Sequence, residues 1–131
     1  MDVTGLGYAP GIVPDQEESF FKADPGLIVL ADQAGSAEGL KTHMGRIASG
    51  DQFVSEEGQR QRIHDTFHAL CAEMEGAAIA QACWRNRVPF VILRSISDNA
   101  DGNAGVSYAE FSEKAAGQAV RLLSRMLKTW S

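Results

Sequence analysis

The sequence predicts an α/β fold with parallel strands, and three observations lead to this expectation. The chain has 131 residues, 44% of them apolar, which is enough for the hydrophobic core of one small domain. Segments with helical periodicity alternate with short apolar segments along the chain. These apolar segments are continuous, which is typical of parallel strands covered on both faces. We therefore expect one domain over 1–131, with an α/β body over 23–131 after an extended segment over 1–22.

The charge and the cysteines narrow the class of partner. The formal net charge is −5 and the Lys and Arg residues form no cluster, which argues against a nucleic-acid partner. Cys71 and Cys83 lie in apolar segments without CxxC spacing, so we expect buried thiols in a reducing compartment rather than a disulfide. No apolar run approaches the roughly 18 residues of a membrane span, and the start of the chain lacks a signal-peptide pattern. These features predict a cytoplasmic protein.

The first 22 residues predict an extended segment. The stretch "GLGYAPGIVPDQEESFF" contains three glycines and two prolines and shows no periodicity. A disordered tail is one interpretation. The other is a segment that packs on a partner, because Leu6, Tyr8, Ile12 and the Phe20–Phe21 pair are unfavourable in water.

The remaining elements follow in alternation. Asp24 as N-cap and Pro25 at the first helical position predict a helix that ends at Gly35 or Gly39.

Ser107 and Glu110 have capping-box spacing and predict the start of the last helix. Between these two helices we expect a strand over 43–49, a polar helix over 55–67, a strand over 69–75, an alanine-rich helix over 76–86 and a strand over 89–96. Three strands leave a sheet with at least one unprotected edge.

Polar clusters follow each of the three expected strands. They are residues 49–53, 73–75 and 94–98. The carboxyl ends of parallel strands meet at one edge of a sheet, where ligands of α/β proteins collect. We therefore expect the three clusters to form an active site together.

Each cluster also has a structural interpretation. One of Glu73 and Glu75 would cap the following helix, since their side chains alternate between the faces of a strand. Arg94 and Asp98 would form a structural ion pair, and Phe53 would belong to the core. The spacing of His64 and His68 suits a metal ion, but a third ligand is not evident and an exposed surface is favoured.

The segment "AEMEGAAIAQACWRNRVPFVILRSISDNAD", residues 72–101, resembles the bacterial 5′-methylthioadenosine/S-adenosylhomocysteine nucleosidases of the purine nucleoside phosphorylase superfamily. The blocks E-M-E-x-x-A-I-A, V-P-F and R-S-I-S-D occur there in this order. "SGDQF" and "GLGYAPGIVPD" are similar to the family's upstream pieces. The resemblance covers nearly the whole chain. It implies a three-layer phosphorylase/nucleosidase-like fold that is incomplete, because the N-terminal strands of the central sheet have no counterpart here.

The resemblance implies roles for residues around the base. Asp98 would protonate or hydrogen-bond N7 of adenine so that the base can leave, and Ser97 would orient it. Phe53 would stack on adenine, and the backbone of Val54 would read the purine's Watson–Crick edge. Arg94 would stabilise the carboxylates around the sugar and the attacking water.

Further roles concern the sugar and the 5′ group. Glu75 would bind the ribose hydroxyls and Met74 would line the sugar. Tyr108 stands where the family often has Phe beside the 5′-alkylthio group, and this departure leaves the 5′ specificity open. The resemblance implies a purine nucleoside as ligand and no cofactor or metal.

The resemblance also implies partners. Leu6, Tyr8 and Pro14 match residues that reach over the neighbouring subunit's site in family dimers. The family's N-terminal half supplies a water-activating glutamate and a glycine-containing loop at the ribose, neither of which has a counterpart here. We therefore expect a C-terminal half that forms a dimer or joins a complementing N-terminal half, and that hydrolyses methylthioadenosine poorly or not at all alone.

Other functions stay open at this point. A purine nucleoside phosphorylase would use phosphate in place of water with a similar base pocket, and an aminofutalosine-type nucleosidase would share that pocket. A non-catalytic purine-binding or assembly subunit would keep the pocket and lack turnover.

Overall fold

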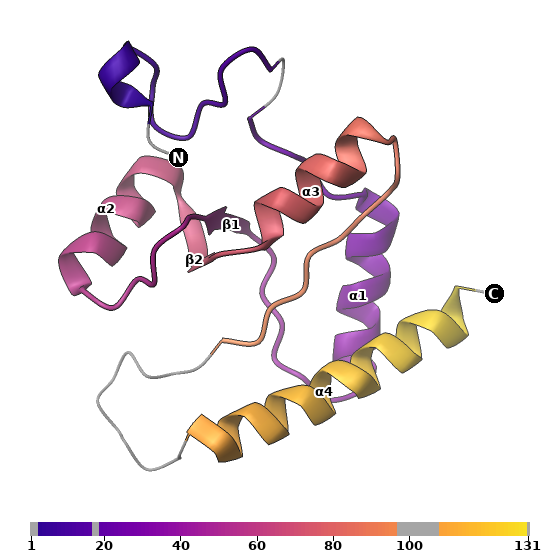
Figure 1. The fold of residues 1–131 in the computed structure, drawn as a ribbon. Coiled ribbons are helices and arrows are strands. Elements are labelled where there is room, and N and C mark those ends of the chain that lie inside the picture. The colour runs from indigo at the N-terminus through magenta and orange to yellow at the C-terminus, as the bar shows by residue number, and fades with distance from the viewer. Residues whose placement is uncertain (1–2, 17–18, 97–107, 131) are drawn as a thin grey trace. The chain divides into compact units, whose positions relative to one another are not determined.

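The computed structural model describes residues 3–16, 19–96 and 108–130, and these form two compact units (Figure 1). The first unit comprises Met1–Ala23 and Gly45–Ile92, and the second comprises Asp24–Met44 and Leu93–Ser131, each as far as the structure describes it. Each unit has its own buried residues. Their structures are therefore given one at a time.

A strand–helix–strand arrangement forms the centre of the first unit. The strands β1 (Arg46–Ser49) and β2 (Ala69–Glu73) pair in parallel, and the helix α2 (Glu57–Phe67) lies in the connection between them. Parallel strands require such a crossover, usually through a helix. The helix α3 (Gly76–Arg85) follows β2 after two residues and contacts β1. The expected fold class, with parallel strands alternating with helices, is confirmed for this part of the chain.

Small side chains let the elements of the first unit approach closely. Ala69 at the start of β2 is buried, as are Gly76 and Ala80, which stand four residues apart on α3. Positions four apart lie on the same face of a helix, so this face is the one turned inward. The predicted alanine-rich helix thus packs through its smallest residues.

The N-terminal segment packs against its own unit. It contains a short 3-10 helix, η1 (Thr4–Leu6), and is otherwise irregular as far as it is described. The Phe21 ring lies 5.7 Å from that of Trp84 on α3, and the Arg46 guanidinium lies 4.9 Å from the Phe20 ring centre. Such contacts are favourable for aromatic rings. The Phe20–Phe21 pair therefore anchors this segment to the body of the unit.

Two helices form the second unit. The helix α1 (Pro25–Ala37) starts as expected, because the Asp24 carboxylate accepts a 3.0 Å hydrogen bond from the Leu27 N–H. The helix α4 (Tyr108–Thr129) contacts α1, with Met126 buried on α4 and Ala31 and Ala34 buried on α1. The core of this unit is therefore small.

A charged contact supports the pairing of α1 and α4. Glu38 follows the C-terminal end of α1, where a helix dipole disfavours a carboxylate. Arg125 of α4 donates to Glu38 from Nη2 at 2.9 Å and from Nε at 3.0 Å, and Arg121 lies 3.8 Å away. The arginines are half exposed, so each pair contributes at most about 1 kcal/mol. Their joint effect is to offset the unfavourable position of Glu38.

The prediction of a third strand over 89–96 is wrong. Within the described residues the sheet has two strands, and residues 89–96 make no ladder with them. The boundary between the two units falls inside this run, after Ile92. The apolar composition of the run was recognised, but a strand also needs a neighbour to accept its backbone hydrogen bonds. Leu93 and Ile96 remain exposed there.

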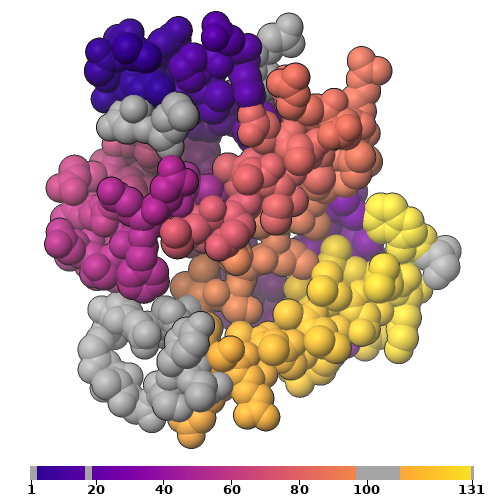
Figure 2. All heavy atoms as spheres, in the orientation of Figure 1, coloured from indigo at the N-terminus to yellow at the C-terminus, as the bar shows by residue number. Residues whose placement is uncertain are grey.

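Large apolar side chains lie on the surface of α4. Exposed apolar residues at helical spacing form a stripe along α4 and the residue that follows it, namely Val120, Leu123, Leu127 and Trp130. Figure 2 shows this helix in orange and yellow. Spacing of three and four residues places them on one side. No large side chain among the described residues is fully buried. We define these four residues as the α4 stripe.

Two further observations concern the cysteines and the helices. Cys71 and Cys83 were expected to be buried, and the structure shows them as half-buried thiols. Among the helices described, none combines the length and the apolar character needed to cross a membrane.

Candidate active site

Two of the three polar clusters, residues 49–53 and 73–75, lie at the ends of neighbouring strands. Ser49 at the end of β1 is paired in register with Glu73 at the end of β2. The Gly50 N–H donates to the Glu73 carbonyl at 3.0 Å, which extends the ladder by one hydrogen bond. The segment that carries Phe53 and the turn that carries Glu75 therefore start side by side, as the sequence predicted for the carboxyl edge of a parallel sheet.

Phe53 lies on the surface. Its side chain is 82% exposed, so the interpretation of this residue as core is wrong. The next residue, Val54, is half-buried. Gln59 of α2 donates to the Gln52 side chain at 3.0 Å and ties this segment to the helix. An exposed aromatic face on a tethered segment is suited to stack on a flat heterocycle.

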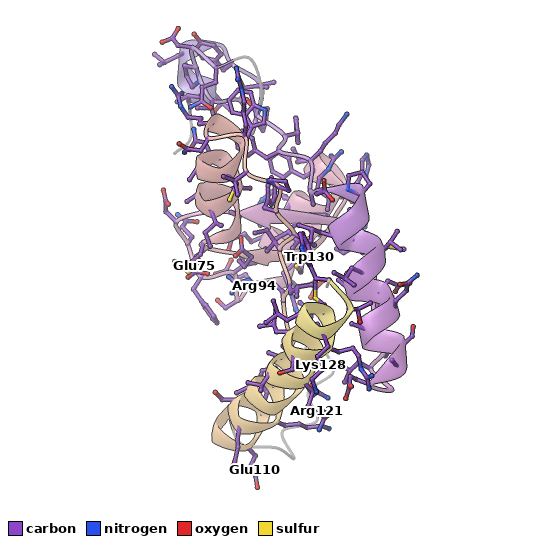
Figure 3. All side chains as sticks on the ribbon, turned by 90° about the vertical axis from the view of Figure 1, so that its right-hand side faces the viewer. Glu75, Arg94, Glu110, Arg121, Lys128 and Trp130 are labelled. Atoms are coloured by element: carbon purple, nitrogen blue, oxygen red, sulfur yellow. The ribbon has the colours of Figure 1, made fainter. Side chains whose placement is uncertain are left out.

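Glu73, not Glu75, caps the helix α3. The Glu73 carboxylate accepts hydrogen bonds from the Gly76 N–H at 2.8 and 2.9 Å and from the Glu75 N–H at 3.1 Å. Glu75 is the N-cap residue, yet among the described residues its side chain makes no capping hydrogen bond to α3. Glu75 lies where β2 passes into α3 (Figure 3) and is exposed, as is Met74. The two glutamates thus have different environments.

Ser49 joins the first strand to this cap. Its hydroxyl donates to Glu73 Oε1 and accepts from the Ala77 N–H at 2.8 Å. Sequence reasoning placed Ser49 and Glu73 in the polar clusters but gave neither of them a role in the site. The available signal was a short polar side chain at one strand end opposite a carboxylate at the next.

Comparison with known proteins shows the family of this chain. Residues 1–128 match the family model described as the Phosphorylase superfamily. The chain belongs to the phosphorylase superfamily. This confirms the resemblance stated for the sequence and the fold class that it implies.

Relatives of this chain within the superfamily are named for their functions. The chain is 42% identical over 129 residues to a 5′-methylthioadenosine/S-adenosylhomocysteine nucleosidase of Staphylococcus saprophyticus, covering 98% of this chain and 56% of the relative. A crystal structure of the corresponding Campylobacter jejuni nucleosidase superposes with a TM-score of 0.88 at 34% identity, over 98% of this chain and 56% of that chain. The structure of futalosine hydrolase of Helicobacter pylori superposes with a TM-score of 0.85 at 31% identity, over 98% of this chain and 53% of that chain. The chain thus spans about half the length of these superfamily members.

The third polar cluster belongs to a different part of the structure. Arg94 is an exposed residue of the second unit. Together with Leu93 and Ser95 it lines a hollow of about 340 Å³ whose other wall is α4. Ser97 and Asp98, the expected catalytic residues that follow Arg94 in the sequence, lie outside the described residues. Their expected place at the site stays a prediction.

The remaining expected site residues lie at the ends of described segments. Tyr108 is the first residue of α4, and its side chain lies outside the description. Leu6 and Tyr8 are exposed, at 76% and 39%, and Pro14 is half-buried. The exposed pair leaves apolar surface on the N-terminal segment.

Two other features of the first unit lie apart from this edge. A hollow of about 460 Å³ lies by Trp84, Arg85 and Arg87, at the opposite end of α3 from Glu75. On α2, hydrogen bonds from His64 and then Gln61 lower the pKa of the exposed Asp65 carboxyl. Within the described residues, no group of three or more His, Cys, Asp or Glu side chains is placed to hold a metal ion.

Proposed function

We propose that this chain supplies the purine- and ribose-binding part of a nucleosidase that hydrolyses 5′-methylthioadenosine and S-adenosylhomocysteine and releases adenine. The observation that carries the proposal is the register of β1 and β2. It starts the Phe53 segment and the Glu75 turn side by side, in a chain that is 42% identical to a protein named as this nucleosidase. Phe53 would then carry the base and Glu75 the sugar.

The chemistry of the reaction agrees with these residue types. Adenine is a poor leaving anion, so its bond to ribose breaks when a proton or a strong hydrogen bond is supplied at N7, the role proposed for Asp98 with Ser97 beside it. The transition state of glycoside hydrolysis resembles an oxocarbenium ion, which nearby carboxylates stabilise. Glu75 would supply such charge while it binds the ribose hydroxyls, and Arg94 would balance the cluster.

A second substrate class has its own support. The likeness to futalosine hydrolase of Helicobacter pylori, at 31% identity and a TM-score of 0.85, favours an aminofutalosine-type substrate. Such a compound differs from methylthioadenosine at the 5′ position, where Tyr108 departs from the family's usual Phe. Adenine release from the two substrates, compared under the same conditions, separates these functions.

The proposed partner is a second copy of the chain or a complementing N-terminal portion. Exposed Leu6 and Tyr8 and the α4 stripe support it, because apolar surface of this kind favours association. We propose that the chain alone hydrolyses its substrate poorly, since the resemblance assigns water activation to a glutamate outside these 131 residues. The half-buried thiols of Cys71 and Cys83 support a cytoplasmic location.

Replacement of Phe53 tests the proposed base platform. Stacking on an aromatic side chain contributes about 1–3 kcal/mol per base, so Phe53→Ala is expected to weaken adenine binding by roughly 5- to 150-fold. The fold is expected to tolerate the change because the ring is 82% exposed. Ligand-observed NMR titration with adenine measures the effect.

Val88→Ala provides the matched control for this titration. It removes an exposed apolar side chain of the same unit, beyond the end of α3 that is remote from Glu75. Equal affinities in Phe53→Ala, Val88→Ala and the unchanged chain would remove Phe53 from the site.

A further inference from the structure

The cap of α3 is shared between two strands and one helix. Glu73 at the end of β2 accepts hydrogen bonds from the backbone of Glu75 and Gly76, and Ser49 at the end of β1 bridges its carboxylate to the Ala77 N–H. Three consecutive N–H groups at the start of α3 are satisfied in this way. The turn that carries Met74 and Glu75 is therefore held at both ends by side chains other than its own.

Gly76 makes the close approach of the carboxylate possible. A Cβ atom at this position would lie 2.9 Å from Glu73 Oε1 and 3.1 Å from its carboxylate carbon. Gly76 itself is buried. A larger residue at position 76 would therefore collide with the Glu73 carboxylate.

Electrostatics explains why Glu73 affects Glu75. The first N–H groups of a helix carry partial positive charge and attract a carboxylate. Glu75 is the N-cap residue of α3, the position whose side chain normally takes up these donors. The Ser49 hydroxyl accepts from the Ala77 N–H, a donor that an N-cap side chain normally takes, and the Glu73 carboxylate accepts from the Gly76 N–H. The Glu75 side chain accordingly makes no cap hydrogen bond to α3.

We infer that Glu73 and Ser49 are positioning residues, which occupy the cap of α3 so that the Glu75 carboxylate faces a nucleoside's ribose hydroxyls. This inference rests on the proposed function and adds residues to it. Neither side chain needs to touch the ligand. We expect their effect to be specific for the sugar, because the hydrogen bonds of both side chains lie at the start of α3, next to Glu75.

The ratio of two affinities tests this role. We expect the unchanged chain to bind 5′-methylthioadenosine more tightly than adenine, the difference being due to contacts with the sugar. Glu73→Gln and Ser49→Ala are each expected to lower this preference about tenfold, the scale of one charge-assisted hydrogen bond, and to leave adenine affinity within about twofold. NMR titration with the two ligands measures both constants, and general loosening of the unit would weaken both ligands alike.

A conservative variant and a second substitution sharpen the test. Ser49→Thr keeps the hydroxyl and is expected to retain the preference, while Ser49→Ala removes a single oxygen and serves if Glu73→Gln reduces stability. An unchanged preference in Ser49→Ala and Glu73→Gln would overturn the positioning role and leave the proposed function intact. If the unchanged chain bound adenine without preferring the nucleoside, the positioning role and the proposed ribose contact of Glu75 would both fall, and the proposed base platform would stand. Binding of neither ligand by the unchanged chain would overturn both.

Discussion

Adenine release from 5′-methylthioadenosine by the 131-residue chain alone is expected to be about 10²- to 10⁴-fold slower than release by the Staphylococcus saprophyticus relative. This is the factor that a general base contributes to hydrolysis. The resemblance assigns the water-activating glutamate to the N-terminal half of the family, and the chain matches 56% of that relative. A coupled assay for adenine at equal protein concentrations measures the ratio.

The same assay gives the control for this expectation. Addition or co-expression of the N-terminal portion of that relative is expected to raise the rate of adenine release, because it would supply the glutamate that the resemblance assigns to that half and would cover apolar surface such as Leu6 and the α4 stripe. Addition of an unrelated protein of similar size should have no effect. Turnover by the chain alone at the rate of the relative would show that these residues contain a complete catalytic apparatus.

Asp98→Asn is expected to lower adenine release by the complemented protein about 10²- to 10⁴-fold, the usual contribution of a general acid. The amide cannot deliver a proton to N7, although it keeps the size of the side chain. Affinity for the nucleoside is expected to change only a few-fold, because in the proposed site Phe53 and Glu75 would hold the base and the sugar. Single-turnover rates and a separate binding titration distinguish the two effects.

Asp101→Asn provides the matched control. It makes the same chemical change three residues further along the same segment. Equal losses in the two variants would mean that the charge of the segment matters rather than an acid at Asp98. Full activity in Asp98→Asn would remove this residue from the mechanism.

Local signals predicted much of the fold. Asp24 and Pro25 mark the start of α1, and the helix begins there with the expected cap. The alanine-rich run predicted α3, and its buried Gly76 and Ala80 show that small residues were indeed the packing signal. These elements are determined by nearby residues, so one sequence is enough to find them.

Features that depend on distant partners were predicted less well. Residues 89–96 have the composition of a buried strand, but pairing depends on a neighbouring strand, and within the described residues no such partner accepts them. Glu73 and Glu75 were equal candidates for the cap of α3, because both lie next to its start. The choice is made by hydrogen bonds that involve Ser49, 24 residues earlier in the chain.

The candidate site was also predicted only in part. The adjacency of the Phe53 segment and the Glu75 turn follows from strand order, which the alternation of elements already indicated. The exposure of Phe53 did not follow, since an aromatic residue after a strand is more often buried. Asp98 and Ser97 remain assigned by the resemblance.

A crystal structure of the chain soaked with 5′-methylthioadenosine tests the assignment of the site most directly. We expect the adenine ring against Phe53 and the ribose hydroxyls about 2.6–3.2 Å from the Glu75 carboxylate. A nucleoside bound in the hollow by Trp84 and Arg85, at the other end of α3, would contradict the account.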